Sequence, residues 1–178
     1  NAAISRMIEM AANQSGIDHR FFVIQDGDEN STEKFFTKNG NHYSPDTKTR
    51  MTEYEKWAIE LTKNAVRDLG KNNKIDFSSI DRLITISCTG FFAPGLDYEL
   101  IKEFKISPSV KRTNIGFMGC AAALIGVNSV WEAMKHKNNE NVLMVSVELC
   151  SLHLQTEPTR DNILANMIFA DGAAAAYF

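Results

Sequence analysis

Hydrophobic positions follow two alternating spacings along the second half of the chain, and the alternation predicts strands followed by helices. Apolar, β-branched runs typical of buried strands occur at 81–88, 110–115 and 141–149. Helical spacing of apolar residues occurs between and after them, at 94–106, 120–135 and 161–168. The run AAAAYF predicts a last strand, so the order favours an α/β fold with helices on the faces of a sheet.

Two predicted helices have a definite apolar face. In the first, Thr52 and Glu55 of TEYE fit a capping box. The apolar side chains of this helix recur every four residues, at Trp57, Leu61, Ala65 and Leu69, and Gly70 ends it. In the second, over 120–135, the side chains expected to face inward are Leu124, Val127, Trp131 and Met134. Another helix at 2–14 precedes a polar stretch at 25–50 that predicts a long surface loop.

Composition bounds the class of protein. The 178 residues are 44% hydrophobic, which suits one compact domain with a substantial core. The formal net charge of -3 argues against nucleic acid and anionic lipid as partners. There is no apolar run of bilayer-spanning length, and Arg6 and Glu9 interrupt the first helix, which argues against a signal peptide. Because the last predicted strand runs to the final residue without a cap, we expect the chain to be one lobe of something larger.

The three cysteines, Cys88, Cys120 and Cys150, are odd in number, widely spaced and set in apolar surroundings. This pattern differs from a secreted disulfide framework and from a C-x-x-C metal site. We therefore expect a reducing compartment, the cytoplasm, and no metal ion.

Cys120 is the candidate nucleophile because it stands between Gly119 and three alanines at the head of a predicted helix. A thiol attacks as its thiolate, and the free N–H groups and macrodipole of a helix N-terminus favour negative charge there. Gly116 and Gly119 permit a tight strand-to-helix turn, as in a nucleophile elbow. The alternative is a buried apolar filler, since free cysteine is among the most buried residue types.

A cysteine nucleophile needs a base, and none of the four histidines is a convincing one. We expect His42 and His136 to be solvated and His19 to be structural. His153 follows the strand at 141–149 and is placed to face the cavity of Cys120, although a structural loop histidine is the alternative. Cys88 and Cys150 end strands at the edge where open α/β sheets hold ligands, with a core cysteine as the alternative for each.

The passage IDRLITISCTGFFAPGLDYELIKEFKISPSVKRTNIGFMGCAAAL resembles the chalcone synthase-like type III polyketide synthases of the thiolase superfamily. The motifs APGLDYEL, SPSVKR and GC occur in the family's order and spacing, followed by VLMVSVEL and FADGAAA. The match is close over 81–178 and loose over the first eighty residues. The abundance of Asn and Lys, with SGIDHRFF, is similar to the C-terminal synthase domain of the slime-mould hybrid synthases called Steely.

The resemblance implies the N-terminal half of a duplicated, layered αβαβα thiolase fold that works as a homodimer. Cys120 would accept an acyl group from a thioester, and malonyl-CoA would be decarboxylated to a carbanion that attacks it over several cycles. The family's catalytic histidine and asparagine lie in the C-terminal half, which would leave this lobe inactive alone. CoA thioesters enter as substrates, so no cofactor is implied.

The resemblance also carries over individual positions. Phe169 matches a gatekeeping phenylalanine, and Arg6 matches a contact to the CoA phosphates. Without the family, the alternatives are a core phenylalanine and a solvated arginine. Positions that match the cavity lining are Cys88, Thr89, Cys150, Leu152 and His153. Met10 stands where a lysine is common, which leaves an acyl carrier protein as an alternative donor of the starter. Ala93 replaces a methionine that reaches into the partner subunit, and the residues at 150 and 153 replace threonines, which argues against chalcone formation.

The sequence also permits two other functions. A ketoacyl synthase of the single-condensation type would share Cys120. A non-catalytic α/β lobe would keep the cysteine for packing and serve as a dimerisation or carrier-docking surface.

Overall fold

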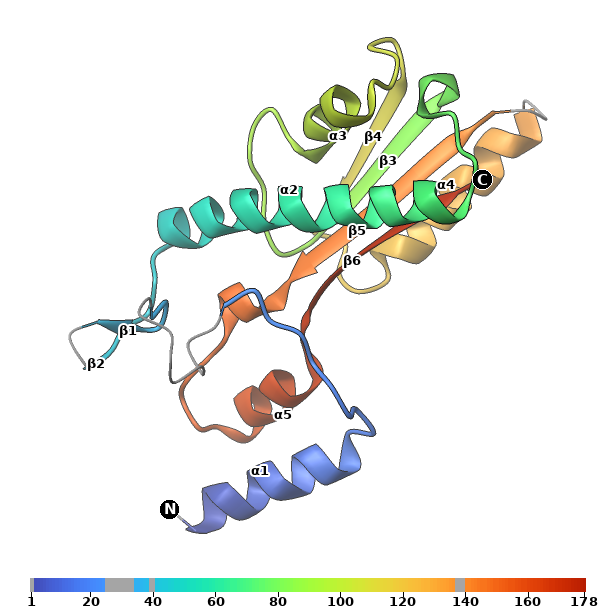
Figure 1. Cartoon of the computed structure of the whole chain (residues 1–178). Coiled ribbons are helices and arrows are strands. Elements are labelled where there is room, and N and C mark those ends of the chain that lie inside the picture. The colour runs from blue at the N-terminus through green and yellow to red at the C-terminus, as the bar shows by residue number, and fades with distance from the viewer. Residues whose placement is uncertain (1, 25–33, 39–40, 137–139) are drawn as a thin grey trace.

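A computed structural model describes residues 2–24, 34–38, 41–136 and 140–178 (Figure 1). The elements are α1 (Ala2–Gln14), β1 (Thr37–Lys38), β2 (Asn41–His42), α2 (Thr47–Asn72), the 3-10 turn η1 (Phe77–Ser79), β3 (Arg82–Ser87), α3 (Leu96–Phe104), β4 (Lys111–Gly116), α4 (Ala122–His136), β5 (Val142–Leu149), the 3-10 turn η2 (Cys150–His153), α5 (Arg160–Ile168) and β6 (Asp171–Tyr177). Every strand and helix predicted in the second half of the chain is therefore confirmed.

The main sheet has four strands in the order β4-β3-β5-β6. Strand β3 runs parallel to β4 and to β5, and β6 runs antiparallel to β5. Parallel strands end at the same edge of a sheet. The ends of β3 and β5, with Cys88 and Cys150 directly after them, therefore lie side by side.

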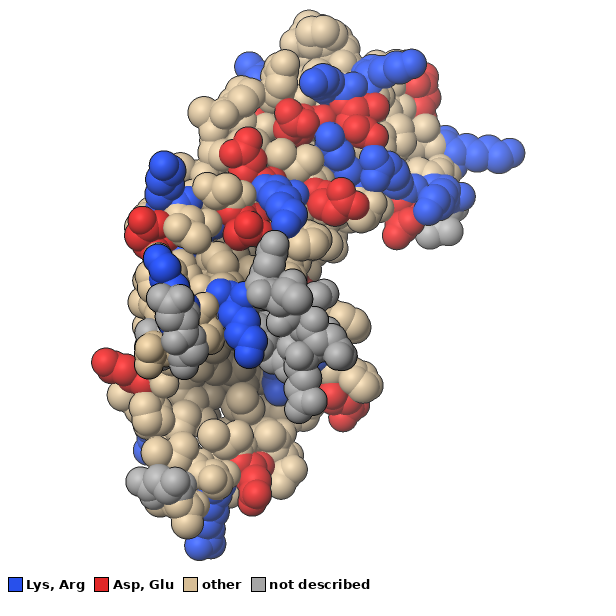
Figure 2. Space-filling view, turned by 60° about the vertical axis from the view of Figure 1, so that its left-hand side comes forward, with Lys and Arg blue, Asp and Glu red and all other residues tan. Residues whose placement is uncertain are grey.

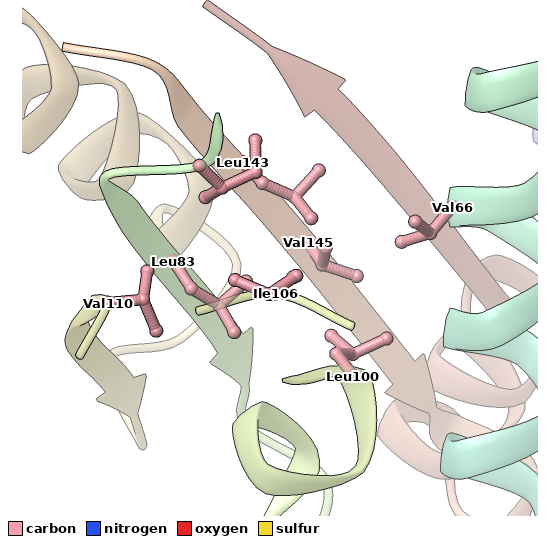
Figure 3. Close-up of a cluster of buried hydrophobic side chains, with 8 residues drawn as sticks. Val66, Leu83, Leu100, Ile106, Val110, Leu143 and Val145 are labelled. Atoms are coloured by element: carbon pink, nitrogen blue, oxygen red, sulfur yellow. The ribbon is translucent and has the colours of Figure 1, made fainter. Parts of the chain in front are cut away.

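Helices cover both faces of this sheet, with α2 and α3 on one face and α4 on the other (Figure 1). Successive residues of β3 point to opposite faces, so Leu83 packs toward α2 and α3 while Ile84 and Ile86 pack toward α4. Figure 3 shows the first of these cores, which consists of Val66, Ile80, Leu83, Leu100, Ile106, Val110, Leu143 and Val145. Full burial of each such side chain contributes about 1.5–3 kcal/mol, so this core fixes the sheet that carries the site.

Helix α2 begins earlier than the sequence predicts. Its N-cap is Asp46, whose side chain accepts a hydrogen bond from the Thr49 N–H at 2.8 Å. The Thr52 hydroxyl donates to the Lys48 carbonyl instead of forming a capping box. The fully buried row is Tyr54, Ala58, Thr62 and Val66, and the predicted row of Trp57, Leu61, Ala65 and Leu69 lies half-buried beside it. Both rows have four-residue spacing, and the row with smaller side chains lies directly over the sheet.

The predicted inward face of helix α4 is wrong. Leu124 is 72% exposed and Trp131 is 61% exposed, and Val127 and Met134 are exposed as well. The sheet is met instead by Ala122, Gly126 and Val130. A Cβ on Gly126 would lie 2.6 Å from Ile86 Cδ1, so the helix packs closer than a larger residue permits. Small residues thus set the contact, and the large apolar side chains form an exposed face.

The polar stretch at 25–50 is only partly a loop. Residues 25–33 and 39–40 of that prediction lie outside the described part of the chain. The described part holds the short antiparallel pair β1–β2 and the first turn of α2.

Charged side chains on the face shown in Figure 2 are interleaved rather than gathered by sign. Among the ion pairs between helices, Lys63 of α2 lies 3.2 Å from Glu99 and 3.3 Å from Glu103, both on α3. Within the described residues, the helices are all too short or too polar to cross a membrane.

Candidate active site

Cys120 lies in the turn that joins β4 to α4, two residues before the helix begins. The turn uses left-handed backbone at Phe117 and Gly119, with φ of 56° and 72°. Gly116 does not adopt that conformation, so the expected role of the first glycine falls to Phe117. The Ala122 N–H donates to the Gly119 carbonyl at 3.0 Å and starts the helix. Cys120 is therefore an exposed thiol at a helix N-terminus.

The turn borders a cavity of about 690 Å³ at the carboxyl edge of β3 and β5. The residues singled out from the sequence that line it are Cys88, Thr89, Cys120, Cys150, His153 and Phe169. Much of the remaining wall is apolar or small, from Ile86, Ala122, Ala123, Leu154 and Ile168. Side chains from segments far apart in the sequence thus line one cavity with the Cys120 thiol, in a space suited to an acyl chain.

Leu152 and Arg6 are not brought to this cavity. Leu152 is fully buried in the core beside Tyr54 and Val147, because the η2 turn directs it back toward the sheet. Leu154, two residues later, lines the cavity in its place. Arg6 is exposed on α1 and does not belong to the lining.

Of the histidines whose side chains the structure describes, His153 lines the cavity and His19 does not. His19 is exposed and lies outside the lining. The side chains of His42 and His136 lie outside the part of the chain that the structure describes. The His153 Nε2 atom lies 2.6 Å from the Thr89 carbonyl oxygen, which can only accept, so Nε2 donates. That nitrogen is not free to take a proton from Cys120.

The thiols differ in environment. Burial raises the pKa of Cys150 to about 11, and the nearby carboxylates of Glu148 and Asp171 add to the effect. Cys150 is therefore a neutral thiol at neutral pH. The Cys88 thiol donates to the Gly119 carbonyl at 3.4 Å, against the backbone that leads into Cys120. Cys120 is the thiol among the three that is exposed.

Glu148 is a cavity residue that the sequence analysis missed. The last residue pair between β3 and β5 is Ile86 with Ser146. Beyond this pair, the Glu148 carboxylate links β5 to the residues that follow β3. It accepts from the Cys88 N–H at 2.9 and 3.1 Å and from the Thr89 hydroxyl at 2.7 Å. A carboxylate at the end of an otherwise apolar, alternating strand was the available signal.

Asp171, in the FADG motif, is a second missed residue. Its carboxylate accepts from the Val23 N–H at 2.7 Å, the Ser151 N–H at 2.7 Å and the Ser151 hydroxyl at 2.5 Å. It thereby ties the segment after α1 to the turn after β5. Within the described ranges, His, Cys, Asp and Glu side chains do not form a group of three or more that could hold a metal ion.

Comparison with known proteins places this chain in a family. The family model described as FAE1/type III polyketide synthase-like protein matches residues 28–178. The chain is 31% identical over 118 residues to the alpha-pyrone synthesis polyketide synthase-like Pks18 of Mycobacterium tuberculosis, covering 66% of this chain and 29% of that protein. It is 32% identical to the 1,3,6,8-tetrahydroxynaphthalene synthase of Streptomyces griseus, covering 74% of this chain and 36% of the relative.

Solved structures of type III polyketide synthases share the fold of this chain. PKS-I from the brown alga Ectocarpus siliculosus matches with a TM-score of 0.87 and 32% identity, over 99% of this chain and 47% of that one. The C-terminal type III polyketide synthase domain of Steely1 from Dictyostelium matches with the same TM-score at 24% identity, a likeness of fold. The chain spans about half the length of these structures. The thiolase-like α/β fold expected from the resemblance is confirmed, and this chain belongs to the type III polyketide synthase family.

Proposed function

We propose that this chain is the N-terminal lobe of a type III polyketide synthase that condenses malonyl-CoA repeatedly onto an acyl starter through an acyl-Cys120 intermediate. One observation carries the proposal. A single cavity at the carboxyl edge of the sheet gathers the exposed Cys120 thiol with Cys88, Thr89, Cys150, His153 and Phe169.

The proposed reaction begins with attack of the Cys120 thiolate on the thioester carbonyl of the starter, which forms a new C–S bond and releases CoA thiolate. Malonyl-CoA then loses CO₂, and its α-carbon attacks the acyl-Cys120 carbonyl. The new C–C bond displaces the Cys120 thiolate and leaves a β-ketoacyl-CoA, which can load again. Phe169 is proposed to shield the carbanion from water at the cavity wall.

Thioesters of CoA are the proposed substrates, without a further cofactor. The described lining includes no Lys or Arg, so the CoA phosphates have to be met outside the cavity. Arg6 on α1 is the proposed contact. Delivery of the starter by an acyl carrier protein is the alternative route into the same cavity.

A C-terminal lobe is proposed to complete the site with a histidine and an asparagine. The exposed apolar face of α4 supports this proposal. It consists of Leu124, Val127, Trp131 and Met134, and contiguous exposed apolar side chains of this kind are typical of a surface that packs against another part of a protein. A homodimer is also proposed, supported by the position of β4 at an edge of the sheet. The three free thiols support a cytoplasmic location.

The experiment is product analysis with the complete enzyme, which carries both lobes. Supplied with an acyl-CoA starter and malonyl-CoA, the wild-type enzyme should release products extended by more than one acetate unit, measured by mass spectrometry. Cys120→Ala should release none, whereas Cys150→Ala should still extend the starter. Polyketide formed by Cys120→Ala would end the proposal, and a product extended only once would replace it with the single-condensation reaction.

A further inference from the structure

Two aromatic rings from distant parts of the chain line the same cavity. Phe22 belongs to the segment that follows α1, and Phe169 belongs to the connection between α5 and β6. Phe22 is 40% exposed and Phe169 is 46% exposed, so each ring lies half in solvent at the cavity wall. The neighbouring Phe21 is 75% exposed and does not line the cavity.

Asp171 holds the backbone on both sides of Phe22. Its N–H donates to the Phe21 carbonyl at 2.8 Å, and its carboxylate accepts from the Val23 N–H at 2.7 Å. Phe169 stands two residues before Asp171, which is the first residue of β6. Asp171 thus ties the backbone around Phe22 to the start of β6, two residues after Phe169.

Two further contacts secure the same region. The Arg20 guanidinium donates to the carbonyl of Met167, at the end of α5 just before Phe169. The Asp171 carboxylate also accepts from the N–H and hydroxyl of Ser151, which lies beside Cys150 on the cavity wall. The segment after α1 is therefore clamped to the wall that Phe169 shares, and the position of Phe22 is specified by charge-assisted hydrogen bonds.

We propose that Phe22 is a specificity-determining residue of the acyl cavity, held at the cavity wall by the positioning residue Asp171, and that Phe22 and Phe169 together limit the length of the apolar acyl chain that Cys120 accepts. The proposal rests on the function proposed above. The apolar side chains of Leu154 and Ile168 in the same wall fit a hydrocarbon chain, and a phenylalanine ring occupies space that additional methylene groups would need.

The test uses the complete enzyme and a series of straight-chain acyl-CoA thioesters from acetyl to dodecanoyl. The rate of acyl loading on Cys120 is followed by intact-protein mass spectrometry. Phe22→Ala should raise the loading rate of the longest thioesters relative to acetyl-CoA by about tenfold. Phe22→Trp should shift the preference toward shorter chains. Phe21→Ala, which keeps the backbone carbonyl that Asp171 binds, is the matched control and should leave the profile unchanged.

Asp171→Asn tests the clamp. It weakens the charge-assisted bonds to Val23 and Ser151, so it should broaden the chain-length profile in the direction of Phe22→Ala, while Asp161→Asn on the surface of α5 should not. A far-UV circular dichroism spectrum like that of the wild type shows that each variant is folded, and labelling of Cys120 by iodoacetamide at the wild-type rate shows that its thiol is reachable. A profile that is the same in wild type, Phe22→Ala and Phe22→Trp overturns the inference even where loading itself is normal. Absence of loading by any thioester in the wild type would instead overturn the proposed function.

Discussion

The two ends of the central sheet each carry a glutamate, and the two side chains have opposite surroundings. At the amino end, Glu140 has a side chain that is only 2% exposed and lies 2.6 Å from Lys111 and 3.2 Å from Arg82, the residues that begin β4 and β3. At the carboxyl end, Glu148 is held by the Cys88 N–H and the Thr89 hydroxyl. No salt bridge reaches Glu148 within the described part of the chain.

The partners decide what each carboxylate does. The hydrogen bond from Lys111, with the guanidinium of Arg82, lowers the pKa of Glu140 below its ordinary value although burial opposes this. Lys111 and Arg82 neutralise the charge of the Glu140 carboxylate, so this carboxylate stabilises the fold. The negative charge of Glu148 instead acts on its neighbours, adding to the effect of burial that raises the pKa of Cys150. A carboxylate at the cavity with neutral donors thus shapes the site, whereas the one with cations holds strands together.

Removal of the cavity carboxylate should have the largest effect. Glu148→Ala leaves the Cys88 N–H and the Thr89 hydroxyl without their acceptor, and Cys88 contacts the backbone before Cys120. A displaced nucleophile costs about a hundredfold in rate, so acyl loading of Cys120 should slow by that factor in the complete enzyme. Glu140→Gln changes the glutamate at the other end of the sheet and should load at close to the wild-type rate. Loading at an unchanged rate in Glu148→Ala would show that this carboxylate does not organise the site.

Removal of the other carboxylate should lower stability. Glu140→Gln leaves Arg82 and Lys111 without their buried counter-charge, which should reduce the free energy of unfolding by about 2 kcal/mol in urea titrations at pH 7. Lys71→Gln removes the exposed pair with Asp68 and should change stability by less than about 0.5 kcal/mol. Equal effects of the two substitutions would contradict the role assigned to Glu140.

The stability difference between wild type and Glu140→Gln should depend on pH with a definite sign. Because the pKa of Glu140 is lowered in the folded state from the ordinary value of 4.5, its contribution is fully present above that value. It is lost as the pH falls and the folded carboxylate takes up a proton. The stability difference between wild type and Glu140→Gln should therefore shrink on acidification below about pH 4, as measured by urea titrations at several pH values. A difference that stays constant in acid would rule out the ion pairs as its source.

The smallest effect concerns Cys150, the thiol with the raised pKa. Alkylation of Cys150 by iodoacetamide should reach half its maximal rate near pH 11, the raised pKa of this thiol, when each cysteine peptide is resolved by mass spectrometry.

The free energy of unfolding should fall as the pH rises from the ordinary thiol pKa of 9.0 toward 11, because the unfolded thiol ionises first. Glu148→Gln should move the midpoint down only part of the way to 9.0, since burial is the main cause. A midpoint at 9.0 in the wild type would show that Cys150 is not shielded.

The fold was predictable from the sequence where one signal decided the outcome. Buried strands such as β3 and β5 stand out because apolar, β-branched runs have few other uses. Helix α4 has two apolar faces, and periodicity cannot tell which one meets the sheet. The tight contact at Gly126, a tertiary feature, decided it. The start of α2 was missed because Asp46 lies in a polar stretch without a hydrophobic period.

The candidate site was predictable where a short motif marks it. Cys120 and Phe169 were located by their motifs, and both line the cavity. Leu152 was misplaced because the η2 turn ends the alternation of β5. Phe22 and Asp171 were missed because their importance comes from hydrogen bonds between segments far apart in the sequence, and spacing within one segment does not show such bonds.

The central proposal is that Cys120 is the thiol that takes up the acyl group at the carboxyl edge of the sheet, and that Cys88 and Cys150 are not acylated. The complete enzyme should be incubated with a starter acyl-CoA at neutral pH, quenched in acid, digested and analysed by peptide mass spectrometry. The account predicts a thioester-linked acyl group on the peptide that contains Cys120 and unmodified thiols at Cys88 and Cys150. An acyl group found on Cys88 or Cys150, with Cys120 unmodified, would contradict it.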